Sequence, residues 1–230
     1  MECEARTGMS QWSPGVRRAL VVVCVFFVFQ QITGINMPLY YGPKLLAPFL
    51  QNGDDVLAAA IAAVGATAIL STVNVIATYF AFRFIDRIGR RNLALGGYAA
   101  MAAAMLLGAA GVAFTTETTQ IVLIMISLTV FMAAFAVGVG GTGWLIQGEY
   151  FPTAVRGRAA ALGATADWLA NLALILLVPT KIAGIGLAWV MIVFTVLCVL
   201  AIAFVAAFMP ETKGLSVEEI TRLFEDRVRR

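Results

Sequence analysis

Six long apolar segments constrain this chain more strongly than any other feature of its sequence. A helix needs about 20 residues to cross a hydrocarbon layer ~30 Å thick, and each segment reaches that length. The apolar residues run on without the alternation of membrane β-strands, and a hydrophobic content of 61% exceeds that of ordinary soluble domains. We therefore predict an all-α, polytopic membrane protein with a six-transmembrane-helix bundle. The segments are approximately Arg18–Tyr41, Val56–Phe82, Asn92–Phe114, Ile121–Ile146, Ala159–Val178 and Ile182–Met209.

The basic residues predict how these segments are oriented. An even number of spans leaves both ends of the chain on one side of the membrane. Of the 16 lysines and arginines, all but Lys44 and Lys181 fall in the leader, at the very start of the first segment, in the second and fourth connections, or in the tail. By the positive-inside rule we expect these parts, and both termini, on the cytoplasmic side of an inner or plasma membrane. The net charge of +3 then reflects topology, and we expect a lipid bilayer, not nucleic acid, around the chain.

The predicted spans divide the chain into three parts. Residues 1–16 form a cytoplasmic leader, residues 17–209 the transmembrane domain, and residues 210–230 a cytoplasmic tail. In the tail, Ser216 and Glu219 have the Ser-x-x-Glu spacing of a capping box, which predicts the start of a short helix. This helix is expected to lie against the membrane surface or the base of the bundle. Its apolar face carries Ile220, Leu223, Phe224 and Val228.

The composition indicates no metal, no cofactor and no enzymatic chemistry. The chain lacks histidine, which is the commonest metal ligand and general base. Cys3, Cys24 and Cys198 predict no disulfide framework, because two of them lie in apolar segments. We therefore predict a protein that is neither an enzyme nor dependent on a cofactor.

Amide side chains inside the first apolar segment predict a binding surface within the membrane. These side chains are Gln30, Gln31 and Asn36. Placing a polar group in hydrocarbon without a hydrogen-bond partner costs several kcal/mol of free energy. Such residues usually face a cavity or another helix. Gly34 and Pro38 lie among them and predict a place where the helix weakens or breaks.

Three clusters that mix acids and bases follow the second, fourth and sixth segments, all on the predicted cytoplasmic side. They are Asp-Arg-Ile-Gly-Arg-Arg at residues 86–91, Glu-Tyr-Phe-Pro at 149–152 with Arg156, and Pro-Glu-Thr-Lys-Gly at 210–214. Exposed salt bridges are individually weak, so a set of them suits a latch that opens and closes. Retention of positive loops on the inside is the simpler explanation of the first cluster. The predicted charge network consists of Asp86, Arg90, Arg91, Glu149, Arg156 and Glu211.

In their order and spacing, these motifs resemble the C-terminal half of a sugar porter of the major facilitator superfamily. In that family the seventh helix carries Gln-Gln-x-x-Gly-x-Asn followed by two tyrosines, and Asp/Glu-x-x-Gly-Arg-Arg joins the eighth and ninth helices. A tenth helix with a tryptophan ends in Glu-x-x-Pro-x-x-x-Arg, and Pro-Glu-Thr-Lys-Gly follows the twelfth. The resemblance extends from Trp12 to Leu215. It implies half of a carrier that transports a monosaccharide, or a polyol, by alternating access.

The resemblance also implies roles for individual residues. Amides would hydrogen-bond sugar hydroxyls, and a tryptophan would pack against the apolar face of the sugar ring. Tyr40 and Tyr41 would form the external gate, and the charge network would form the cytoplasmic latch. The alternatives are helix packing for the tryptophans, interhelical hydrogen bonds for the amides and an interfacial aromatic belt for the tyrosines. The expected substrate-binding residues are Gln30, Gln31, Asn36, Asn74, Trp144, Asp167, Trp168 and Asn171.

Two departures from the family pattern affect this expected site. Gly140-Gly141-Thr142-Gly143 stands before Trp144 where the family usually has Gly-Pro-x-Pro, so glycine flexibility replaces a fixed kink. Asp167 occupies a position that is usually an amide. It lies about 13 Å beyond Arg158 along a helix, near the middle of the bilayer. We hypothesise that Asp167 accepts hydrogen bonds from sugar hydroxyls and titrates during transport, the alternative being a structural partner for a neighbouring helix.

The resemblance includes only one of the family's two six-helix halves, which leaves several questions open. The chain is a fragment of a longer transporter, the partner of a separately made N-terminal half, or a homodimer. A membrane protein that senses sugar without transporting it, or a remnant that binds nothing, is the rival function. The sequence does not distinguish proton symport from facilitated diffusion, nor one sugar from another.

Overall fold

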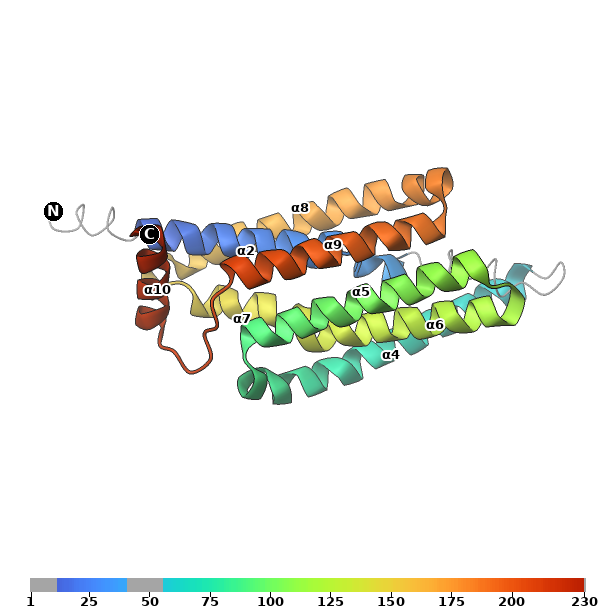
Figure 1. Ribbon diagram of the computed structural model, residues 1–230, viewed down its shortest axis with the longest axis horizontal. Helices are drawn as coiled ribbons and strands as arrows, with labels where there is room; N and C mark the ends of the chain where they lie inside the picture. Colours follow the sequence, from blue (N-terminus) through green and yellow to red (C-terminus); the bar gives the residue numbers. More distant parts are fainter. Residues whose placement is uncertain (1–11, 41–55, 230) are drawn as a thin grey trace, which may run out of the picture.

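The computed structural model describes residues 12–40 and 56–229, and the regular elements in these ranges are helices (Figure 1). Six helical spans in the described ranges are long and apolar enough to cross a membrane, which confirms the predicted all-α bundle. The fourth span contains a π-helical turn in its middle. The elements are α2 (Pro14–Ile32), α4 (Val56–Ile88), α5 (Arg90–Phe114), α6 (Glu117–Ala134), η1 (Phe135–Gly140), α7 (Gly141–Glu149), α8 (Thr153–Ile185) and α9 (Leu187–Phe208).

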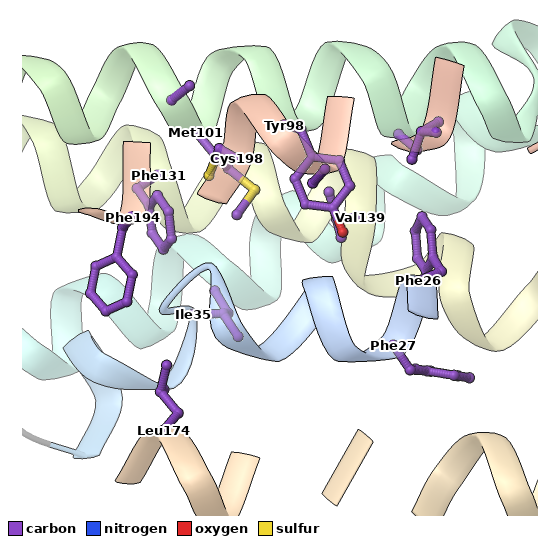
Figure 2. Packing of buried hydrophobic residues seen from close by; sticks show 14 of the residues in the cluster. Phe26, Phe27, Ile35, Tyr98, Met101, Phe131, Val139, Leu174, Phe194 and Cys198 are labelled. Carbon is purple, nitrogen blue, oxygen red and sulfur yellow. The ribbon is translucent and has the colours of Figure 1, made fainter. Parts of the chain in front are cut away.

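The helices form an elongated bundle in which α5 packs against α6 and α9, and α2 packs against α8 (Figure 1). Buried aromatic and sulfur-containing side chains fill the space between α2, α5, α9 and the fourth span. Figure 2 shows Phe26 of α2 approaching Tyr98 of α5, with their ring centroids 6.1 Å apart in an edge-on arrangement. Large apolar side chains on α4 and α8 are exposed instead, as expected for surfaces that meet lipid or another membrane element.

The first span breaks where the sequence predicts a weak point. α2 ends at Ile32, residues 33–35 form a turn, and the chain is helical again at 36–40. Gly34 has a φ of 96°, a backbone conformation that is strained for residues with a side chain. A Cβ at this position would also lie 2.8 Å from the ring of Phe194. The close approach of Phe194 therefore requires glycine at this turn.

Two connections are shorter than the sequence suggests. The second span continues past Phe82 to Ile88, and α5 starts after the single residue Gly89, whose φ is 98°. In the same way α8 runs through Pro179 and ends before Gly186, whose φ is 84°. A helix saturates its own backbone hydrogen bonds, so it persists until a residue that tolerates positive φ allows a sharp turn.

The C-terminal residues form the predicted amphipathic helix, α10 (Val217–Arg229), which lies across one end of the bundle (Figure 1). The backbone N–H of Ser216 donates to Glu219 Oε2 at 2.7 Å, and the N–H of Glu219 donates to Ser216 Oγ at 3.4 Å, which confirms the capping box. The hydrogen bonds that the Ser216 backbone N–H and hydroxyl donate to the Glu219 carboxylate lower the pKa of this carboxyl. On the apolar face Ile220 and Phe224 are buried, whereas Leu223 remains 38% exposed.

Two glycines allow α5 and η1 to approach closely. A Cβ on Gly97 would lie 2.8 Å from the Cα of Gly138, and one on Gly138 would lie 2.5 Å from the Cα of Gly97. Small residues permit such backbone contacts between membrane helices. The neighbouring Gly96 has open space around its Cβ position instead.

We expect Gly97→Ala to lower the free energy of unfolding by about 1–3 kcal/mol, because the added methyl group forces the two helices apart. Gly96→Ala is the matched control and should raise stability slightly through helix propensity. Thermal unfolding of the purified variants in detergent measures both effects. Equal stability of the two variants would contradict the close contact between Gly97 and Gly138.

Candidate functional site

A chain of side-chain hydrogen bonds joins α2, the segment 36–40 and α8. Gln31 Nε2 donates to Asp167 Oδ1 at 2.7 Å, and Asn36 Nδ2 donates to Gln31 Oε1 at 2.7 Å and to Asn171 Oδ1 at 3.0 Å. Asp167 and Asn171 lie one helical turn apart, so they share a face of α8. The structure thus brings four of the predicted substrate residues together, and we call Gln31, Asn36, Asp167 and Asn171 the amide–acid network.

The network lies at the middle of the bundle and spans the broken helix. Asp167 is near the midpoint of the 33-residue helix α8. Gln31 precedes the turn around Gly34 and Asn36 follows it, so the hydrogen bond between their side chains closes over the break. Gln31, Asp167 and Asn171 are buried, whereas Asn36 is only half-buried. Asn36 is therefore the member most accessible from outside the network.

Asn74 and Trp144 belong to a second group. Both line a cavity of about 620 Å³ between α4 and the η1–α7 region, which also reaches Asp86 at one end. Its described lining is mostly apolar and includes none of the amide–acid network. The two groups are connected through α2, because the Trp144 ring packs edge-on against Phe27 at 5.0 Å between centroids. Phe27 lies one turn before Gln31.

Gln30 connects α2 to the π-helical turn. Its Nε2 donates to the backbone carbonyl of Gly140 at 3.4 Å, while its Oε1 is buried and has no hydrogen-bond donor among the described residues. A Cβ on Gly143 would lie 2.5 Å from that Oε1, so the glycines before Trp144 make room for the amide. The π-helix η1 widens the backbone at this point, a distortion that is frequent at functional sites.

Trp168 and Tyr40, which were also predicted to contact the substrate or to gate its access, take no part in either group. Trp168 is 62% exposed, because it follows Asp167 by one residue and points about 100° away around α8. Tyr40 is 51% exposed at the end of the described segment, and Tyr41 lies outside the described residues. The gate role of the two tyrosines therefore stays a prediction.

Three residues of the predicted charge network meet at one end of the bundle. Arg90 Nη2 lies 2.9 Å from Asp86 Oδ1 and 2.9 Å from Glu149 Oε1. The other carboxylate oxygen of Glu149 accepts from Thr212 Oγ1 at 3.3 Å. The Arg90 side chain is only 10% exposed, whereas that of Asp86 is 75% exposed. The pair with Asp86 is thus open to water and weak, and the pair with Glu149 is better shielded.

Glu211 caps the start of α5 from a distant part of the chain. Its carboxylate accepts hydrogen bonds from the backbone N–H groups of Arg90 at 3.0 Å and Arg91 at 3.2 Å. A negative charge at a helix N-terminus also interacts favourably with the helix dipole. A Cβ on Gly89 would lie 2.5 Å from Glu211 Oε2, so the glycine of the Asp-x-x-Gly-Arg-Arg motif is needed for this contact as well as for its positive φ.

The side chains of Arg91 and Arg156 bind backbone carbonyl groups and form no ion pair within the described residues. Arg91 Nη2 donates to the carbonyl of Ala206 at 2.7 Å, and Arg156 Nε donates to that of Phe151 at 3.2 Å. Two further residues contribute to these sites and were not predicted from the sequence. Thr212 binds Glu149, and Gln147 of α7 is buried with its Oε1 unpartnered among the described residues. Gln147 could have been predicted as a site residue, because it is an amide at the end of an apolar segment.

The chain is similar to known sugar transporters. The family model described as "Sugar (and other) transporter" matches residues 3–224. The arabinose-proton symporter of Bacillus subtilis is 36% identical over 227 residues, which cover 97% of this chain and 47% of the symporter. The glucose transporter GlcP of Staphylococcus epidermidis is 32% identical over 208 residues, covering 90% of this chain and 45% of the transporter. The inward-open structure of the xylose transporter XylE from Escherichia coli matches with a TM-score of 0.73 and 30% identity, covering 89% and 42% of the two chains. The chain therefore spans less than half the length of these relatives.

We expect Glu211→Ala to loosen the first turn of α5. Loss of a helix cap costs about 1 kcal/mol, so hydrogen exchange at the amides of Arg90 and Arg91 should accelerate roughly fivefold. Hydrogen–deuterium exchange with mass spectrometry measures this, and Asp226→Ala on the exposed side of α10 is a charge-matched control. Unchanged protection in Glu211→Ala would show that water caps the helix equally well.

Proposed function

Because the chain belongs to the sugar transporter family of the major facilitator superfamily, we propose that it is the substrate-binding half of a carrier for a monosaccharide or polyol. It is a multi-pass membrane protein with the half-fold of that superfamily. The amide–acid network is the observation that carries the proposal. Four polar side chains are held together halfway along a membrane-spanning helix, where unpartnered polar groups are costly.

The chemistry of the network suits a polyhydroxylated ligand. A hydroxyl group both donates and accepts a hydrogen bond, and an amide offers two donor hydrogens together with an acceptor oxygen. Amides can therefore exchange hydrogen bonds among themselves for hydrogen bonds to a sugar at little net cost. The indole ring of Trp144, which is 47% exposed, supplies an apolar surface for the C–H face of a sugar ring.

Transport by alternating access requires joints that move and contacts that break, and the described residues offer both. The turn at Gly34 and the π-helical turn η1 interrupt two spans beside the network. At the opposite end of α7, Arg90 is paired with Glu149 and with the exposed carboxylate of Asp86. In the proposed mechanism these ion pairs form the cytoplasmic latch, and Tyr40 and Tyr41 close the external side. In this proposal both termini lie on the cytoplasmic side of the cell membrane.

The carrier is proposed to contain a second six-helix unit facing the network. The relatives that this chain matches are about twice as long, which supports such a unit. The exposure of Trp144 and the open cavity that it lines with Asn74 also support a covering surface. A second part of the same polypeptide, a separate chain or a second copy would each supply it. Native mass spectrometry in mild detergent distinguishes a homodimer from a monomer.

Binding of sugar to the purified chain tests the proposal. We expect D-glucose, D-xylose, L-arabinose or myo-inositol to quench the fluorescence of Trp144 and Trp168 saturably in lipid nanodiscs. Gln31→Ala should weaken binding by roughly 10- to 100-fold, because it leaves Asp167 and Asn36 without their shared partner. Gln120→Ala, an amide whose Nε2 donates to the carbonyl of Val112 away from the network, is the matched control.

Two outcomes would contradict the proposed function. Absence of saturable quenching by all four compounds would indicate a remnant that binds no sugar. Equal affinity in Gln31→Ala and Gln120→Ala would place the sugar away from the network. With binding established, uptake into liposomes with and without an inward proton gradient separates proton symport from facilitated diffusion.

A further inference from the structure

Asp167 gives the hydrogen bonds of the amide–acid network one direction. In its ionised form the Asp167 carboxylate has no donor hydrogen and only accepts, so Gln31 must turn its Nε2 toward it. The Oε1 of Gln31 then points to Asn36 and accepts a hydrogen bond from Asn36 Nδ2. The two hydrogens of that Nδ2 go to Gln31 Oε1 and Asn171 Oδ1. Each orientation is thus determined by the one before it, starting from the acid.

This direction decides which atom of the network is left for a ligand. Both hydrogens of Asn36 Nδ2 are committed, so the atom of this amide that remains for a ligand is its carbonyl oxygen. Among the described residues no donor reaches Asn36 Oδ1. Asn36 is also the half-buried member of the network, whereas its partners are buried. A ligand at this place therefore meets an acceptor and must bring a donor.

An amide at position 167 would leave the direction undetermined. Asparagine has nearly the same shape as aspartate but offers either its oxygen or its N–H₂ group to Gln31. Gln31, Asn36 and Asn171 could then reverse together, and Asn36 would present either a donor or an acceptor to the ligand. Both arrangements contain three hydrogen bonds within the network, so the number of hydrogen bonds favours neither of them. The acid removes one of them.

We propose that Asp167 is a positioning residue that acts through Gln31 to fix Asn36 Oδ1 as a hydrogen-bond acceptor, so that the carrier demands a hydroxyl donor at one position of its substrate. This rests on the proposed function and adds a selectivity rule to it. The substrate class is a sugar or polyol with a free hydroxyl group at that position. A ligand that carries fluorine there cannot donate and is rejected.

Fluorinated sugars test the rule. The chain in lipid nanodiscs is titrated with the sugar that quenches most strongly among the four above, and then with each of its monodeoxy-monofluoro analogues. We expect one analogue to bind roughly 10-fold or more weakly than its parent, because a buried acceptor is left without a donor. In Asp167→Asn this penalty should fall below about threefold, because Asn36 can then turn its N–H₂ group toward the fluorine.

A double variant separates positioning from direct contact. In Asp167→Asn with Gln31→Glu, the carboxylate stands at position 31 and accepts from both neighbours, so Asn36 must again present its oxygen. The fluorine penalty should return to roughly 10-fold. If Asp167 touched the sugar itself, the double variant would not restore selectivity. Asp226→Asn, which removes an exposed carboxylate on α10, controls for the change in net charge.

Each result bears on the inference. An unchanged fluorine penalty in Asp167→Asn overturns it, and so does failure of the double variant to restore the penalty. Thermal unfolding and gel-filtration profiles that match the wild type establish that the variants are folded. A wild-type chain that binds none of the parent sugars overturns the proposed function, and the inference with it. A wild-type chain that binds sugars without any fluorine penalty overturns the inference alone.

Discussion

In a hydrocarbon layer every backbone N–H and C=O group must find a partner within the protein, and the rest of this structure depends on that requirement. It makes each apolar span a helix and extends the helices to the glycines that permit a turn. Where a helix breaks or widens, side chains replace the lost partners. Gln30 donates to the carbonyl of Gly140 at the π-helical turn, and Glu211 accepts from the first N–H groups of α5. The interruptions that a membrane protein tolerates are therefore the places where its polar side chains gather.

One short helix joins the two polar regions of the molecule. α7 starts after Gly140, which accepts from Gln30, and ends at Glu149, which pairs with Arg90. Gly143 leaves room for the Gln30 side chain to lie against α7. Gly138, in the π-helical turn before α7, lets the same span approach α5. The nine residues of α7 thus connect the proposed sugar site and the proposed latch through one continuous helix. A carrier that opens alternately on two sides needs such a connection between its centre and its end.

The candidate site was predictable from the sequence where a polar residue interrupts an apolar segment or matches a family motif. Amides inside an apolar run indicated Gln31 and Asn36, and the family resemblance indicated Asp167 and Asn171. The structure brings these four together. Their division from Asn74 and Trp144 was not predictable, because it depends on how α4 and α8 sit around α2. The same holds for Trp168 and Arg156, whose directions follow from small rotations around their helices. Residue type indicates that a polar contact is needed, but not which atom satisfies it.

The sequence by itself determined the number of spans, the break at Gly34 and the capped helix of the tail. These features follow from local causes, namely apolar length, glycine and side-chain capping. Only the tertiary structure decided that Glu211 caps a helix more than a hundred residues away, and that Asp167 gives the amides one direction. Both are contacts between segments distant in the chain. A hydrogen bond depends on the distance and angle between two particular atoms, and only the packing of the helices sets them.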